Sequence, residues 1–79
     1  MTMASDTRFY TLRISGTLDK EFLAAYCPAG ATMTVYDTHV ILGNLHTDQS
    51  GILGIIRQLH NFGCILLTLD ATVLLKQIG

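Results

Sequence analysis

The stretch from His46 to Asp70 constrains the fold of this chain more than any other part of it. Its apolar side chains recur at the spacing of a helix that faces a core, and Gly63 is suited to the left-handed residue that ends such a helix. Thr47 or Asp48 is the expected N-cap, since either side chain can accept hydrogen bonds from free N–H groups of the first turn. The apolar segment 64–69 follows at once and predicts a strand. The core-facing positions of the helix are Ile52, Ile55, Ile56, Leu59 and Phe62.

Two shorter elements are predicted upstream of this helix. Residues 8–15, RFYTLRIS, alternate with a period of two, so they predict a strand, and Gly16 ends it. Thr17 is the expected cap of a short helix, with Asp19 and Glu21 in its first turn, where the helix dipole favours negative charge. The segment Tyr26-Cys27-Pro28-Ala29-Gly30 ends that helix.

The order of all the elements predicts the fold. Residues 32–36 and 39–45 are expected to form a hairpin around Asp37-Thr38, which gives strand, helix, strand, strand, helix, strand. This is the order of the ferredoxin-like, or split βαβ, fold. We therefore predict an α+β domain over residues 8–70, a four-stranded antiparallel sheet with two helices on one face. Residues 1–7 are expected to be a flexible N-terminus, and residues 71–79 a C-terminal apolar tail or an extra strand.

Composition predicts self-association. Hydrophobic residues make up 49% of the 79 residues. Charged residues make up only 14%, whereas typical proteins contain about 25% charged residues. A chain this short is marginal as a lone monomer, so we expect a homodimer or a higher closed oligomer. The last strand lies at a sheet edge in this fold, and its apolar side chains need cover. The face of the sheet that is turned away from the helices is also expected to carry apolar side chains and to contribute to the contact between copies.

Charge and hydropathy argue against nucleic-acid and membrane partners, and the cysteines indicate the compartment. The net charge of −1 and the five scattered Lys and Arg residues argue against nucleic acid. No apolar run approaches the roughly 20 residues of a membrane span. Cys27 and Cys64 are expected to be buried, reduced thiols of a cytoplasmic protein.

Residues over most of the chain share a two-part pattern with other proteins. They are Tyr10, Leu12, Ile14, Gly16, Gly43, Leu45, Asp48, Gln49, Gly54, Ile55, Leu59, Phe62, Gly63, Leu66 and Leu67. The pattern is T-x-L-x-G-x-L-x-D-Q-x-x-L-x-G-L-L-x-x-L-x-x-L-G-x-x-L-L, after an N-terminal Y-x-L/I-x-I/V-x-G strand. In these residues the chain resembles a family of short, uncharacterised bacterial proteins, and the resemblance implies a fold and no assigned chemistry.

A second, local resemblance concerns the start of the longer helix. Residues 48–53, DQSGIL, followed by Ile56, Leu59 and Gly63, are similar to the acid-x-x-glycine start of ACT regulatory domains. Those domains share the βαββαβ order and often bind amino acids at subunit interfaces near the glycine turn. In them the motif precedes the first helix, whereas here it precedes the second.

These observations indicate one candidate ligand site. Exposed N–H groups at a helix start, with a glycine that allows close approach, can hold a small anionic or amino-acid-like ligand. The alternative is that the carboxylate of Asp48 merely caps the helix. The predicted ligand-binding residues are His46, Asp48, Gln49, Ser50 and Gly51, and the predicted structural glycines are Gly16, Gly43 and Gly63.

Catalytic and metal-binding patterns are weak by comparison. No Cys or His pair has the close spacing of a metal site, and no cofactor motif occurs, so we predict no metal, no cofactor and no catalytic residue. The predicted function is a small homo-oligomeric interaction or ligand-responsive module. The alternative is a small enzyme with a pocket between the sheet and a partner chain, using His39, His46 or Asp48.

Overall fold

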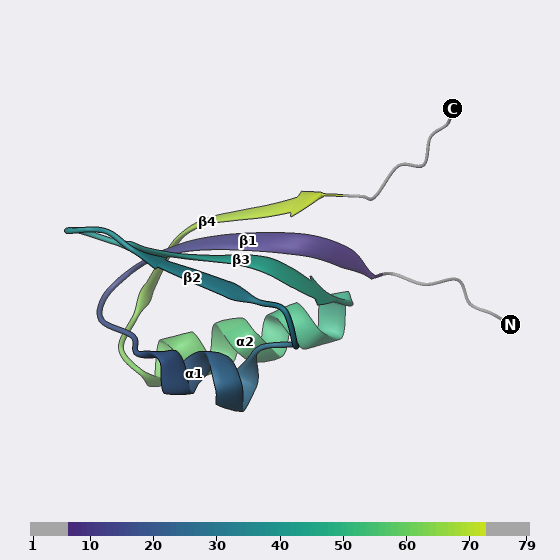
Figure 1. Cartoon of the computed structure of the whole chain (residues 1–79), viewed down its shortest axis with the longest axis horizontal. Coiled ribbons are helices and arrows are strands. Elements are labelled where there is room, and N and C mark those ends of the chain that lie inside the picture. The colour runs from purple at the N-terminus through teal and green to yellow at the C-terminus, as the bar shows by residue number, and fades with distance from the viewer. Residues whose placement is uncertain (1–6, 73–79) are drawn as a thin grey trace, which may run out of the picture.

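The computed structural model describes residues 7–72 and contains the predicted succession of elements (Figure 1). The two helices differ in length, and the second carries the periodic apolar positions identified in the sequence. The elements are β1 (Arg8–Ser15), α1 (Lys20–Tyr26), β2 (Thr32–Val35), β3 (Val40–Thr47), α2 (Gln49–Asn61) and β4 (Ile65–Thr72).

The sheet has the order β2-β3-β1-β4, with every neighbouring pair antiparallel. Both helices lie on the same side of it, and no helix of the described residues lies on the other side (Figure 1). The predicted α+β arrangement is therefore confirmed, a four-stranded antiparallel sheet covered on one face by two helices. The two outermost strands are β2, which has four residues, and β4, which has eight.

The core lies between the helices and the two central strands. In β1 the alternating residues Tyr10, Leu12 and Ile14 are buried, as their period of two predicts. The other core side chains come from β3, from both helices and from the two connections that flank the helices. They are Leu18, Phe22, Val40, Leu42, Leu45, Ile52, Ile55, Leu59 and Cys64.

Two bulges break the regular pairing of β1 with its neighbours. Between β1 and β3, Tyr10 pairs with Leu45 and Leu12 with Leu42, so β3 contributes one residue too many at this point. Asn44 lies in this bulge and adopts the left-handed backbone conformation, with a φ of 56°. Because of the extra residue, Leu42 and Leu45 both face the core although they are three positions apart. The bulge was not predicted, because the sequence has no glycine at the residue with positive φ.

The second bulge lies in the pairing of β1 with β4. Arg13 pairs with Thr68 and Ile14 with Leu66, which leaves Leu67 without a direct partner. Because cross-strand partners share a face, Leu66 and Leu69 both lie on the helix side of the sheet. The simple alternation expected for this strand therefore does not hold along its length.

Two predicted boundaries need correction, the start of α1 and the end of β4. Asp19, not Thr17, caps α1, with its carboxylate accepting a hydrogen bond from Glu21 N at 3.1 Å. Leu18 is buried ahead of the helix, so the chain stays extended for two residues longer than predicted. β4 runs through Asp70 to Thr72, because Asp70 pairs with Thr11 on the face without helices, where its carboxylate stays hydrated. The predicted tail therefore contributes residues 71 and 72 to β4, whereas residues 73–79 and residues 1–6 lie outside the described part of the chain.

Candidate functional site

Asp48 acts as the N-cap of α2. Its carboxylate accepts a hydrogen bond from Gly51 N at 2.7 Å, and its carbonyl accepts one from Ile52 N at 3.0 Å. The capping role is thus confirmed. A negative charge already occupies the helix start, so this geometry disfavours a second anion at the same N–H groups.

Gly51 is needed for space beside Thr47. A Cβ placed on Gly51 would collide with the hydroxyl of Thr47, and it would also lie 3.2 Å from the Asp48 carboxylate. The close approach at this glycine is therefore used by the chain's own side chains. The sequence suggested a glycine that admits a ligand, but it could not show which neighbour fills the space.

Of the other predicted ligand residues, Gln49 and Ser50 lie at the helix start and His46 lies on the sheet. Gln49 and Ser50 are exposed in the first turn of α2. His46 stacks on the ring of Phe9, its cross-strand partner, with centroids 4.3 Å apart and planes 12° apart. This pair lies on the sheet face opposite the helices, so the structure separates His46 from the first turn. A ligand role for this set stays a prediction.

The three predicted structural glycines have different surroundings. Gly63 has a φ of 84° and follows the end of α2, which confirms it as the left-handed helix stop. Gly43 lies opposite Thr32 in the β2–β3 pair. Gly16 follows β1 next to Cys64, whose Sγ would lie 3.0 Å from an added Cβ.

The residues suggested for catalysis lie apart. His39 stacks on Tyr36 with centroids 4.8 Å apart, and its Nδ1 lies 3.1 Å from Thr38 Oγ1. His46 lies seven residues further along, roughly 23 Å away by the rise of a strand. Among residues 7–72, no three His, Cys, Asp or Glu side chains lie close enough together to hold a metal ion.

The two cysteines are free thiols with little nucleophilic character. Burial raises the pKa of the Cys27 thiol and that of the Cys64 thiol, so both stay protonated near neutral pH. Cys64 is buried, and Cys27 is half-buried at the end of α1. Neither therefore supplies an activated nucleophile.

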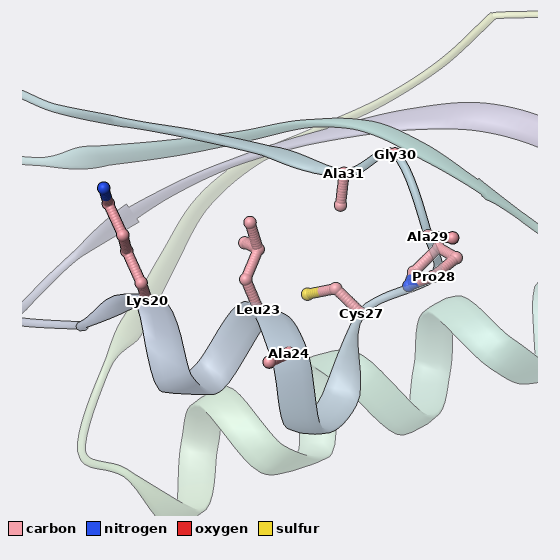
Figure 2. A pocket seen from close by; sticks show the side chains of 8 residues that line it. All are labelled: Lys20, Leu23, Ala24, Cys27, Pro28, Ala29, Gly30 and Ala31. Atoms are coloured by element: carbon pink, nitrogen blue, oxygen red, sulfur yellow. The ribbon is translucent and has the colours of Figure 1, made fainter.

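A cavity of about 430 Å³ lies between α1 and the segment that leads into β2 (Figure 2). Figure 2 shows Leu23, Cys27 and Ala31 facing it, with the Lys20 ammonium group at one end. Its other lining residues are small or apolar, so a single cation is its one charged group. The cavity offers an apolar surface but no acid–base or nucleophilic pair.

The most exposed apolar surface of the described chain belongs to β4. All eight of its residues are exposed, and within residues 7–72 no strand lies beside its outer backbone edge. An exposed, apolar edge of this length, about 26 Å, is a ready template for pairing with another strand. The exposed fractions are 64% for Ile65, 40% for Leu66, 49% for Leu67 and 45% for Leu69.

Away from β4, the open sheet face carries few apolar side chains, among them Phe9 and Ile41. Residues paired across that face include Thr11 with Asp70, Arg13 with Thr68 and Thr34 with Ile41. The expected apolar face is therefore mostly polar. The opposite edge, β2, is half as long as β4. β4 is thus the one long apolar edge of the described sheet.

An aromatic cluster was not identified from the sequence. Phe22 and Tyr26 of α1 meet Phe62, the C-cap of α2, which had been expected to face the core but is 53% exposed. Phe22 and Tyr26 are four residues apart, the spacing that places two side chains on one helix face. That spacing was the available signal, but only the packing of the two helices brings Phe62 to them.

Comparisons with protein-family models, curated proteins and solved structures give no match for this chain. In the described residues, no helix has the length and apolar character needed to cross a membrane. The candidate sites therefore depend on the chain's own geometry.

Proposed function

We propose that the chain is a small homo-oligomeric interaction module whose copies join edge to edge through β4. The single observation that carries the proposal is the exposure of β4, eight residues long, along its whole length. Pairing with a second β4 would satisfy the free backbone groups of the edge and cover its apolar side chains.

The area available is consistent with reversible association. The exposed fractions of the four apolar β4 side chains together amount to about two whole side chains per copy. Complete burial of such a side chain contributes about 1.5–3 kcal/mol, or about 6–12 kcal/mol for two copies. Association costs about 4–15 kcal/mol, so the new strand hydrogen bonds decide the net affinity, and we expect it in the micromolar range.

A two-fold axis between the β4 strands accommodates the bulge. In an antiparallel pair that sets Leu66 opposite Leu69 of the second copy, both side chains lie on the helix side of the joined sheet. Ile65 then lies opposite Asp70 of the second copy on the other side. Two-fold dimers are the commonest closed oligomers, and this register makes the contact self-complementary.

Sedimentation equilibrium of the whole chain tests the proposal. We expect a species of twice the monomer mass of 8.6 kDa at micromolar concentration. Ile65→Lys should shift the population to monomer, since a lysine on an edge strand opposes strand pairing. Val35→Lys is the matched control, because Val35 is 65% exposed and lies on the opposite edge strand, β2.

The comparison of these two variants decides between routes of assembly. Dissociation by Ile65→Lys alone supports the β4 edge. Equal dissociation by both variants would indicate a general effect of added charge, and a monomer at all concentrations would overturn the proposal.

The same proposal places the module in a reducing compartment such as the cytoplasm. It is supported by the two free thiols, Cys27 and Cys64, because free cysteines are typical of reducing compartments. Non-reducing electrophoresis of the chain from cells should show no disulfide-linked species, whereas a cross-linked dimer would contradict this placement.

A further inference from the structure

Three aromatic rings meet on the helix layer, and none of them belongs to β4. Phe62 lies edge-on to both rings of α1, with centroids 5.3 Å from Phe22 and 6.0 Å from Tyr26. Phe22 and Tyr26 are tilted at 48° with centroids 5.0 Å apart. Phe22 is buried as the floor, while Tyr26 is 41% exposed and Phe62 is 53% exposed. The cluster thus presents two partly open rings above a buried one.

A cavity of about 220 Å³ opens beside these rings. Its six lining residues include all three rings, the small side chain of Ala25 and two carboxylates, Asp19 and Glu21, with no basic group among them. Asp19 caps α1 and stays fixed there, because it accepts a hydrogen bond from Glu21 N. Aromatic walls and a double negative charge therefore share one small concavity.

We propose that this cavity binds a small alkylammonium cation. Aromatic rings attract cations through the negative potential of their faces, and quaternary ammonium groups are the ligands that aromatic cages bind best. The carboxylates add attraction that an anion or a neutral ligand would not feel. The volume lies below the 300–1,000 Å³ of pockets for drug-sized ligands, so it suits a single ammonium head group.

The site is independent of the proposed β4 contact. Its residues come from α1, from the N-cap of α1 and from the C-cap of α2, and none belongs to β4. A monomeric chain would keep the cavity, so failure of the assembly proposal would leave this one standing.

Titration with choline chloride, followed by the backbone and ring NMR signals of the whole chain, tests the proposal. The expected result is saturable shifts centred on Glu21, Tyr26 and Phe62, with a dissociation constant in the millimolar range. The control ligand is 3,3-dimethyl-1-butanol, the neutral isostere in which carbon replaces the ammonium nitrogen. It should bind at least threefold more weakly if charge is recognised.

Two pairs of variants measure separately how much the Tyr26 ring and the Glu21 carboxylate contribute to choline affinity. Tyr26→Leu keeps an apolar side chain but removes the ring, and Tyr36→Leu is its control at an exposed tyrosine that stacks on His39 instead. Glu21→Gln removes one charge, and Asp37→Asn in the β2–β3 connection is its control. Each test variant should weaken choline about two- to fivefold, and each control should leave the affinity unchanged.

Several outcomes would overturn the proposal. Equal affinity for choline and its neutral isostere would make the site a hydrophobic patch only, whereas we expect a clear preference for the cation. Absence of shifts at 50-fold the concentration of protein, or shifts that Glu21→Gln and Asp37→Asn reduce equally, would also contradict it. Because Glu21 is exposed, its variant stays informative even if Tyr26→Leu unfolds the chain.

Discussion

Single residues at the ends of α2 fix where that helix begins and stops. Asp48 and Gly63 were both identified from the sequence, because capping and left-handed backbone are local requirements that one residue type satisfies best. Gly51 was predicted to admit a ligand, whereas the structure shows that the side chain of Thr47 takes the space beside it.

Gly63→Ala and Gly54→Ala should change stability in opposite directions. An added Cβ meets nothing within 4 Å at either position, so steric contact does not contribute to the difference in stability between the two variants. At Gly63 the φ of 84° makes alanine cost about 1 kcal/mol, whereas alanine at Gly54, inside α2, should stabilise by about 0.5–1 kcal/mol. Urea unfolding of both variants measures this, and effects of the same sign would contradict the assignment of Gly63.

Asp48→Asn should keep most of the stability that Asp48→Ala loses. Asparagine caps about as well as aspartate, and the alanine variant should lose about 1 kcal/mol through the unsatisfied Gly51 N–H. Thermal unfolding of the two variants is the measurement. Equal losses would instead indicate a role for the negative charge, such as the ligand binding predicted from the sequence.

Gly51→Ala should destabilise α2 by about 1 kcal/mol or more, in contrast to the tolerance expected of a first-turn glycine. The cause is the collision with the Thr47 hydroxyl, so Thr47→Ala in the same chain should recover much of the loss. A double-mutant cycle in urea measures the coupling. Additive effects would show that Thr47 is not the obstacle.

At the scale of elements, the two bulges mark where prediction from the pattern fails. The period-two alternation of β1 is confirmed, because this strand is central and its inward side chains are all apolar. In β3 and β4 one extra residue reverses the alternation, at Asn44 and at Leu67. The apolar run from Ile65 to Leu67 permits either face at each position, so the sequence could not locate the shift.

The β3 bulge supplies a test at this scale. Asn44 holds a φ of 56°, and its Nδ2 donates to Gly30 O at 2.7 Å. Asn44→Ala loses the hydrogen bond and keeps the strained backbone, so it should cost about 1–2 kcal/mol; Asn44→Gly relieves the backbone and should cost less. Urea unfolding compares them, and equal costs would show that the side-chain hydrogen bond alone matters.

For the whole molecule, composition predicted an excess of apolar surface, and the structure locates it. The sheet order and the placement of both helices followed from the succession of elements, since few topologies accommodate it. The sequence predicted two places for this surface, the last strand at the sheet edge and the face away from the helices, and it did not decide between them, because the exposed area depends on how far the helix layer extends. The helices leave Leu66 and Leu69 exposed although their partners Ile14 and Leu12 are fully buried.

Thermal stability should therefore depend on protein concentration. If copies pair through β4 and the unfolded chain does not pair, mass action raises the unfolding midpoint as concentration rises. With an unfolding enthalpy of about 0.7 kcal/mol per residue, a dimer of this chain should gain about 4 °C in Tm for each tenfold increase. Ile65→Lys should remove that dependence, while Val35→Lys should retain it, since its side chain belongs to the other edge strand. Calorimetry from about 5 to 500 μM measures the slope, and a Tm of the unaltered chain that stays constant over this range would mean that the edge of β4 remains unpaired in solution.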